Sequence, residues 1–189
     1  MDYRAYQKAS EKHLSTCKSI MNSISLLSAN NEALIMQEIK LKSVLHNVYY
    51  LSGYTLECII NYAIFKHFKW SKPSVRDNDH NFSKRCGLSY GNLKQTDKPG
   101  NYPYIIHKHD FARNIDILRK EFSASKIPLI DITEKIDNEV LKLFKSWNVE
   151  IRYHALTSNY DKVQLTTTNI QNFVNTTDRV FNGLMKIIG

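Results

Sequence analysis

Glycine and proline are scarce in this chain. Its 189 residues include 6 Gly and 4 Pro, too few for the many tight turns of a β-sandwich or a β-barrel. The hydrophobic content of 42% and the charged content of 23% are ordinary for a water-soluble globular protein. The composition therefore favours long helices, and the length fits one domain.

Cysteine is also rare. Cys17, Cys58 and Cys86 are odd in number and far apart, and none lies in a CxxC or a cysteine–histidine metal-binding spacing. This pattern indicates reduced thiols in a reducing compartment, so we expect a cytoplasmic protein. The N-terminal segment has no apolar stretch typical of a secretory signal peptide, which agrees with that expectation.

The sequence lacks the signatures of bound cofactors and of covalent nucleophiles. Gly87 and Gly91 lie close together but do not form a Walker phosphate loop. No serine or cysteine lies in a local nucleophile motif. We therefore expect no cofactor.

One apolar run, residues 44–65, has the length of a membrane span. It also carries His46, Asn47, Glu57 and Asn61. A membrane helix would have to bury all four polar groups in lipid, which is costly. We therefore expect a helix inside a globular bundle and no membrane partner.

Apolar residues recur at helical spacing along most of the chain. The spacing predicts helices at about 2–27, 31–68, 110–122, 133–155 and 168–188. The second segment is apolar on most sides, as is typical of a helix at the centre of a bundle. The predicted fold class is all-α: a compact bundle of about five helices in one domain, residues 1–189, with a long loop insertion at about 70–106.

The insertion is basic and aromatic. Residues 66–98 contain eight Lys or Arg and three Asp, a charge of +5 (8 minus 3). Basic groups among aromatic rings suit single-stranded nucleic acid, through phosphate contacts and base stacking. The alternative is a solvated loop whose rings anchor it to the bundle. The residues expected to bind nucleic acid are Lys72, Arg76, Lys84 and Arg85.

The whole chain is basic, with a net charge of +8 and a pI of about 9.3. A basic excess favours an acidic partner, such as nucleic acid or a nucleotide. The alternative is a basic protein whose charge serves only solubility.

The predicted central helix carries one polar stripe. Its members follow one another at steps of three or four residues and so share a narrow sector: His46, Tyr50, Gly53, Glu57 and Asn61. The stripe is either the solvent-exposed face of the helix or the lining of a cleft or a dimer seam. The residues expected at such a cleft or interface are His46, Tyr50, Tyr54, Asn61, Trp147 and Tyr153. If Glu57 is buried it needs a cation or hydrogen-bond donors, and Arg152 is a candidate partner.

The segment SWNVEIRYHAL, residues 146–156, places Arg152 and His154 close together. In a continuous helix their side chains point about 200° apart. They could therefore act on one phosphate only if the helix ends there, or across a dimer. The alternative is structural: Trp147 and Ile151 lie in the core, Arg152 pairs with an acid, and His154 sits at a helix C-terminus, where a cation is favoured.

A second cluster, HKHD, spans residues 107–110. His107, His109 and Asp110 could ligate a metal, but there is no second ligand cluster at a matching spacing. Asp110 is instead a suitable N-cap for the helix that follows. We favour the N-cap and expect no metal.

Three segments, in this order, resemble the HEPN-domain family: YYLSGYTLECIINYAIF (49–65), HDFARNIDIL (109–118) and WNVEIRY (147–153). The resemblance covers nearly the whole chain apart from the insertion. It implies a compact helical bundle, usually dimeric. Proteins of that family occur in toxin–antitoxin modules, in phage defence and beside minimal nucleotidyltransferases, and many are metal-independent ribonucleases.

The family's ribonuclease motif is an arginine and a histidine separated by four to six residues, and six bring both side chains to one helix face. This sequence departs from it, because Thr157, Ser158 and Asn159 occupy those positions after Arg152. The resemblance alone therefore leaves the enzymatic activity open. If the protein cleaves RNA, we expect Arg152 to stabilise phosphate charge, His154 or His109 to move protons, and Glu57 to orient Arg152.

Three hypotheses about function follow. The first is a homodimer that binds RNA, and could cleave it without a metal, in a toxin, stress or phage-defence setting. The second is a non-catalytic HEPN-like module that binds a nucleotide or a partner protein, such as an antitoxin or a nucleotidyltransferase, through the polar stripe. A plain helical scaffold is the third reading.

Overall fold

The structure of the chain is a computed structural model. It describes residues 3–28, 34–70, 88–90, 104–107, 109–122, 137–153 and 163–188. For residues 28, 34–39, 88–90, 104, 105, 112, 152 and 153 it describes the backbone but not the side chain. These residues form an all-α bundle of five α-helices with one short two-stranded sheet, which confirms the predicted fold class.

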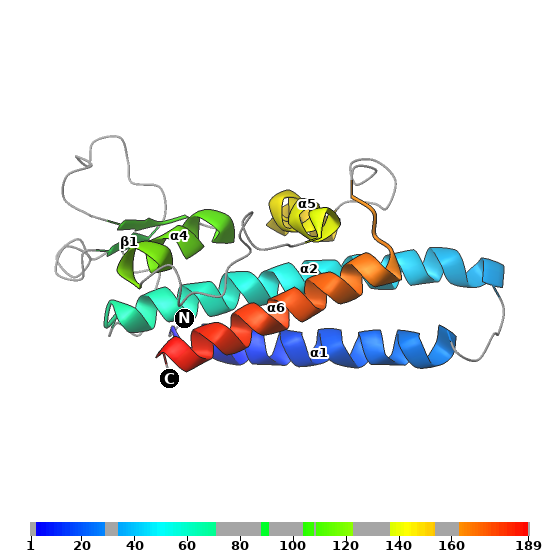
Figure 1. Cartoon of the computed structure of the whole chain (residues 1–189), viewed down its shortest axis with the longest axis horizontal. Coiled ribbons are helices and arrows are strands. Elements are labelled where there is room, and N and C mark those ends of the chain that lie inside the picture. Colours follow the sequence, from blue (N-terminus) through cyan, green and yellow to red (C-terminus); the bar gives the residue numbers. More distant parts are fainter. Residues whose placement is uncertain are drawn as a thin grey trace.

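Three long helices form the body of the bundle. They are α1 (Arg4–Ser28), α2 (Leu34–His67) and α6 (Thr167–Ile188). They pack against one another side by side along the long axis of the molecule, and α1 begins where α6 ends (Figure 1). All three predicted helices are confirmed to within about three residues at each end.

Helix α2 lies at the centre because it has almost no polar face. Every residue from 55 to 65 is buried, so this part of the helix is covered on all sides. The Tyr49 ring meets Phe173 of α6 edge-on, with ring centroids 5.4 Å apart. The Tyr49 hydroxyl also donates a hydrogen bond to the backbone oxygen of Leu143, 2.5 Å away. The Tyr49 side chain therefore joins α2 both to α6 and to the short helix that contains Leu143.

Two shorter helices cover the other side of α2 (Figure 1). Helix α4 (Phe111–Glu121) begins after its N-cap Asp110, whose carboxylate accepts a hydrogen bond from the backbone N–H of Arg113 at 3.0 Å. Helix α5 (Asn138–Ser146) begins after the N-cap Asp137. Both caps satisfy N–H groups that the first turn of a helix leaves without a partner.

The predicted helix at 133–155 is wrong beyond residue 146. Trp147 has an extended backbone (φ −70°, ψ 132°) and ends α5. A short 3₁₀ helix, η3 (Val149–Tyr153), follows and packs on α2. The apolar spacing of Phe144, Trp147 and Ile151 suggested one helix, but the tertiary contacts of Trp147 turn the chain toward α2 instead.

The insertion was predicted to be a loop, and the structure corrects this for six of its residues. Strand β1 (Leu88–Tyr90) pairs in parallel with β2 (Tyr104–Ile106), with Leu88 opposite Tyr104. Each strand has three residues. The pairing joins positions 16 residues apart (104 minus 88). A pattern of neighbouring residues in the sequence therefore could not predict it. Strand β2 leads through His107 toward α4.

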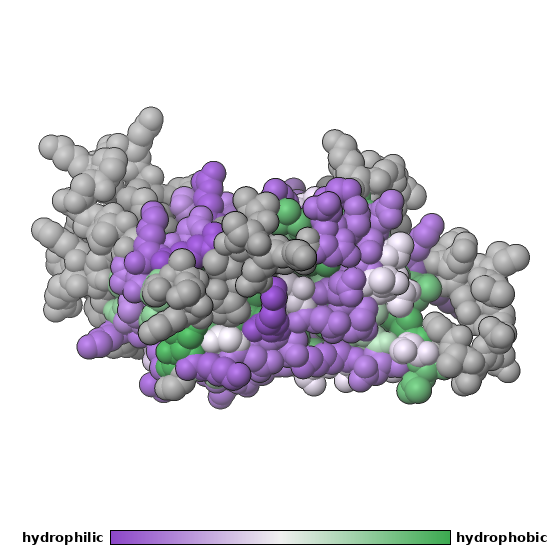
Figure 2. Space-filling model, viewed as in Figure 1, coloured by the Kyte–Doolittle hydropathy of each residue, from purple (hydrophilic) through white to green (hydrophobic). Residues whose placement is uncertain are grey.

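The described surface is mainly hydrophilic on the face shown in Figure 2. Its most exposed large apolar side chains, Leu26 and Leu27, belong to the last turn of α1 and are each 71% exposed. Within the described ranges, every helix is too short or too polar to cross a membrane.

Candidate functional site

A pocket of about 440 Å³ opens where three segments meet above α2. The segments are the start of α4, the end of α5 and the beginning of η3. The residues that line the pocket are His109, Asp110, Phe111, Phe144, Lys145, Trp147, Asn148, Val149 and Glu150. Its volume lies at the small end of the range for ligand pockets, about 300–1,000 Å³.

His109, on the wall of this pocket, is held by a buried carboxylate. Its Nδ1 atom lies 3.0 Å from Oε1 and 3.2 Å from Oε2 of Glu57. The side chain of Glu57 is 7% exposed and that of His109 is 47% exposed. The buried carboxylate of Glu57 on α2 is therefore linked to the pocket through the partly exposed side chain of His109.

The sequence correctly indicated that a buried Glu57 needs a cation or a donor. The structure supplies His109 in that role. The predicted partner was Arg152, of which the structure describes only the backbone within η3. The pairing of Glu57 with Arg152 therefore stays a prediction.

Burial shapes the acid–base behaviour of this region. Desolvation raises the pKa of Glu57, and the charge and hydrogen bond of His109 offset part of that increase. Burial also raises the pKa of Tyr54, one helical turn before Glu57, to about 12, and it raises the pKa of Cys58, the residue after Glu57, to about 12. The Tyr54 hydroxyl and the Cys58 thiol therefore stay neutral near pH 7, which disfavours both as nucleophiles.

The backbone at His109 is in the left-handed region, with φ 58°, an unfavourable conformation for a residue other than glycine. Neighbouring hydrogen bonds hold it there. The Asn114 side chain accepts from the backbone N–H of His107 at 2.8 Å and donates to the backbone oxygen of His107 at 2.8 Å. It also donates to Oδ1 of Asn61, 3.2 Å away on α2.

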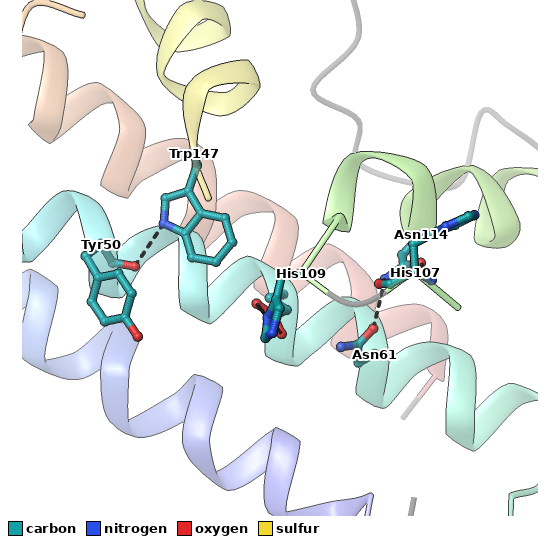
Figure 3. Close-up of polar contacts among 7 residues, drawn as sticks. Tyr50, Asn61, His107, His109, Asn114 and Trp147 are labelled. Carbon is teal, nitrogen blue, oxygen red and sulfur yellow. Dashed lines mark hydrogen bonds and ion pairs between the residues drawn. The ribbon is translucent and has the colours of Figure 1, made fainter. Parts of the chain in front are cut away.

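Asn61 and Asn114 are both buried, at 2% and 0% exposure. Because buried amides are costly unless they are bonded, this pair holds the backbone of His107 and the start of α4 against α2. Figure 3 shows Trp147, His109 and Asn114 reaching successive turns of α2.

Asp110 is the N-cap of α4, as predicted. Its carboxylate also forms an ion pair with Arg113 at 3.3 Å. In the part of the chain that the structure describes, His, Cys, Asp and Glu side chains do not gather into any group of three or more that could hold a metal.

Trp147 forms the inner wall of the pocket. Its indole N–H donates to the backbone oxygen of Tyr50 at 3.2 Å (Figure 3). Its ring lies 5.1 Å from the ring of Phe111, which in turn lies 4.7 Å from Phe144. Trp147 and Ile151 are buried in the core, as predicted. The pocket therefore has a floor of aromatic rings, from Phe111, Phe144 and Trp147. Polar side chains form its rim, namely His109, Asp110, Lys145, Asn148 and Glu150.

The predicted polar stripe of α2 is not a solvent face. His46, Glu57 and Asn61 are all buried, so that interpretation is wrong for them. The segment that leads into α4 covers two of them: His109 bonds Glu57, and Asn114 bonds Asn61. Tyr50 and Tyr54 are half-buried and stack on each other, with ring centroids 6.1 Å apart.

Several predicted site residues lie outside the described residues. They are the nucleic-acid candidates Lys72, Arg76, Lys84 and Arg85, and the catalytic candidate His154. For Arg152 and Tyr153 the structure gives only a backbone position in η3, the segment that also carries the pocket residue Glu150.

Sequence reasoning missed other residues of the site. Asn114 gave a readable signal, because helical spacing places it between Phe111 and Leu118 on the apolar face of α4. A polar residue on such a face needs a partner. Lys145 and Asn148 gave no such signal, because their place at the pocket depends on where α5 ends.

Comparison with known proteins gives no further assignment. The chain matches no protein-family model, no curated protein and no solved structure.

Proposed function

We propose that this protein binds RNA and cleaves it without a metal ion, as many HEPN-domain proteins do. The observation that carries the proposal is the Glu57–His109 pair on the wall of a pocket that also presents Lys145. A histidine held by a carboxylate, beside a cation, is an arrangement suited to proton transfer at a phosphate ester.

His109 is the catalytic residue of the proposal. When its ring is neutral and Nδ1 donates to Glu57, Nε2 is left as the proton acceptor. Among the residues that the structure describes, none hydrogen-bonds to Nε2, and the side chain is 47% exposed. Nε2 is therefore available to a substrate, and Glu57 acts as a positioning residue that fixes the tautomer.

The proposed reaction uses a nucleophile that RNA itself carries. The 2′-hydroxyl attacks the adjacent phosphorus, so that the bond from O2′ to P forms while the bond from P to O5′ breaks. The 2′-hydroxyl proton passes to Nε2 of His109, and the departing O5′ takes a proton from a second acid, for which His154 is the predicted candidate. The products are a 2′,3′-cyclic phosphate and a 5′-hydroxyl.

Charge on the phosphate needs stabilisation as this bond exchange proceeds. Lys145 is exposed and lines the pocket. Arg152 follows two residues after the lining residue Glu150, so it stays the predicted second cation. The net charge of +8 supports an RNA substrate, because phosphates supply most of the attraction in nucleic-acid binding.

The biological setting rests on the resemblance to HEPN domains. We infer a toxin, stress or phage-defence role, and a homodimer, from that resemblance alone. An antitoxin or a nucleotidyltransferase stays the predicted protein partner.

The test incubates purified protein with labelled single-stranded and structured RNA in excess EDTA. We expect His109→Ala to slow cleavage by about 10²–10⁴-fold and Glu57→Gln to slow it by about 10–100-fold. Glu57→Gln should also change the pH profile of the rate, an effect that lost stability alone would not produce. Arg152→Ala and His154→Ala test the two remaining predicted residues.

His67→Ala is the matched control, because His67 forms a similar pair with Glu121 at 3.0 Å, away from the pocket. Equal cleavage by wild type and His109→Ala would overturn the proposed site. If the folded wild type cleaves none of the RNAs, the non-catalytic module that binds a nucleotide or a partner protein becomes the better hypothesis.

A further inference from the structure

The rim of the pocket carries polar groups that the proposed cleavage step does not use. Glu150 and Asn148 both line the pocket and are exposed. The backbone N–H of Glu150 donates to Oδ1 of Asn148 at 2.9 Å, which holds the Asn148 side chain against the backbone of Glu150. In the described part of the chain, neither the Glu150 carboxylate nor the Asn148 Nδ2 group has a hydrogen-bond partner.

Two of the remaining rim groups bond other residues. The carboxylate of Asp110 caps α4 and pairs with Arg113. Nδ1 of His109 is bonded to Glu57. Lys145 and Nε2 of His109 are the rim groups that the proposed cleavage step uses. Among the described residues, the rim then still offers an acceptor pair on Glu150 beside a donor on Asn148, above a floor of aromatic rings.

We propose that this pocket binds the guanine base of a single-stranded RNA, with Glu150 and Asn148 as the specificity-determining residues. This inference rests on the proposed RNA cleavage and adds the identity of the base that the site selects. Bases splayed out of single strands are commonly read on their Watson–Crick edge and held against aromatic side chains.

Guanine is the base whose Watson–Crick edge fits this arrangement. Its N1–H and N2–H₂ groups are adjacent donors that can bond the two oxygens of one carboxylate, and its O6 can accept from Asn148 Nδ2. Adenine presents an acceptor at N1, and uracil and cytosine present an oxygen at O2, which the Glu150 carboxylate would repel. Glu150 and Asn148 are exposed in the free protein, and a bound base would cover them. A polar group that is covered without a partner is costly, which is what makes such discrimination strong.

The test measures binding by calorimetry, independently of cleavage. The probes are the 3′-monophosphates of guanosine, inosine, adenosine, cytidine and uridine. We expect guanosine to bind most tightly, and inosine, which lacks the 2-amino group, to bind more weakly. Glu150→Gln should reduce the preference for guanosine over adenosine by about 5- to 100-fold.

Two further variants sharpen the test. Asn148→Asp keeps an oxygen for the Glu150 N–H but replaces the donor that faces O6, so guanosine binding should weaken while the fold is kept. Glu11→Gln is the matched control, since Glu11 lies exposed on α1, where it bonds Gln7, and it should leave every affinity unchanged.

The outcomes separate this inference from the proposed function. Guanosine preference that disappears in Glu150→Gln, without any RNA cleavage, would support the base pocket and overturn the nuclease. RNA cleavage with equal affinity for all five nucleotides, or with a preference that Glu150→Gln leaves intact, would overturn the base pocket and leave the nuclease standing. No measurable binding of any nucleotide would also overturn the base pocket.

Discussion

The indole ring of Trp147 rests directly on Gly53. A side-chain Cβ at position 53 would overlap Nε1, Cδ1 and Cε2 of the indole. The contact lets the indole N–H reach the backbone oxygen of Tyr50. It also places the end of α5 on α2 and so forms the inner wall of the pocket.

Gly53→Ala should therefore destabilise the protein. Alanine normally favours a helix by about 1 kcal/mol over glycine, but here its methyl group would displace a buried ring. We expect a net loss of about 1–3 kcal/mol in the free energy of unfolding, as for other overpacked cores. Urea denaturation measures this loss, and near-ultraviolet circular dichroism should report the moved indole.

Gly183→Ala, in the half-exposed part of α6, is the control for that experiment. It should be neutral or stabilising, because only helix propensity changes. A Gly53→Ala variant as stable as the wild type would show that the indole does not occupy this position in solution.

Glu57 should make stability depend on pH in a direction opposite to that of most carboxylates. Its pKa in the folded protein is raised above the ordinary 4.5 of the unfolded chain, so the folded state holds the proton more tightly. The stability that this proton contributes is fully present below pH 4.5 and is lost as the pH rises through the folded pKa.

Glu57→Gln removes this ionisation and can still accept from Nδ1 of His109. We therefore expect Glu57→Gln to gain stability relative to the wild type as the pH rises. Urea denaturation at a series of pH values measures the difference, with exposed Glu11→Gln as the control. Parallel stability curves for Glu57→Gln and the wild type would contradict the raised pKa.

The Asn61–Asn114 contact should carry a measurable coupling energy. Asn114→Ala removes three hydrogen bonds. Asn61→Ala removes the acceptor of one hydrogen bond that the buried Asn114 amide donates. Each change should cost about 1–3 kcal/mol, and a double-mutant cycle should give a coupling of about 0.5–3 kcal/mol. Additive effects would contradict a shared network.

Asn175→Ala is the control for the asparagine cycle. Asn175 is exposed on α6 and bonds only Gln171 among the described residues, so its effect should stay within about 0.5 kcal/mol. Under the proposed function, Asn114→Ala should also slow RNA cleavage, because it removes the hydrogen bonds that hold the backbone of His107, two residues before His109.

The two buried thiols should resist alkylation in the folded protein. Burial raises the pKa of Cys58 to about 12 and also raises the pKa of Cys17, and only the thiolate reacts. In a Cys86→Ser background we expect almost no reaction with iodoacetamide near pH 8, and full reaction of both thiols in denaturing urea. Rapid labelling of either thiol in the native protein would contradict their burial.

Helix positions could be predicted where the signal is local. The apolar periodicity of α1, α2, α4 and α6 comes from residues three or four apart, and Asp110 sits one residue before the helix that it caps. The same apolar periodicity gave a wrong prediction of one helix over 133–155. Trp147 and Ile151 have helical spacing, but the chain between them is not α-helical. The strands β1 and β2 had no local signal, since each has three residues and finds its partner across the insertion.

The sequence by itself determined that α2 is a central helix and that a buried Glu57 requires a partner, because hydrophobic periodicity and the cost of burying charge act residue by residue. Only the tertiary structure decided that the partner is His109, 52 residues away, that Trp147 ends α5 on Gly53, and that Lys145, Asn148 and Glu150 share one pocket. These outcomes depend on how rigid elements pack against each other, and packing brings together side chains whose distance along the chain carries no information about their distance in space.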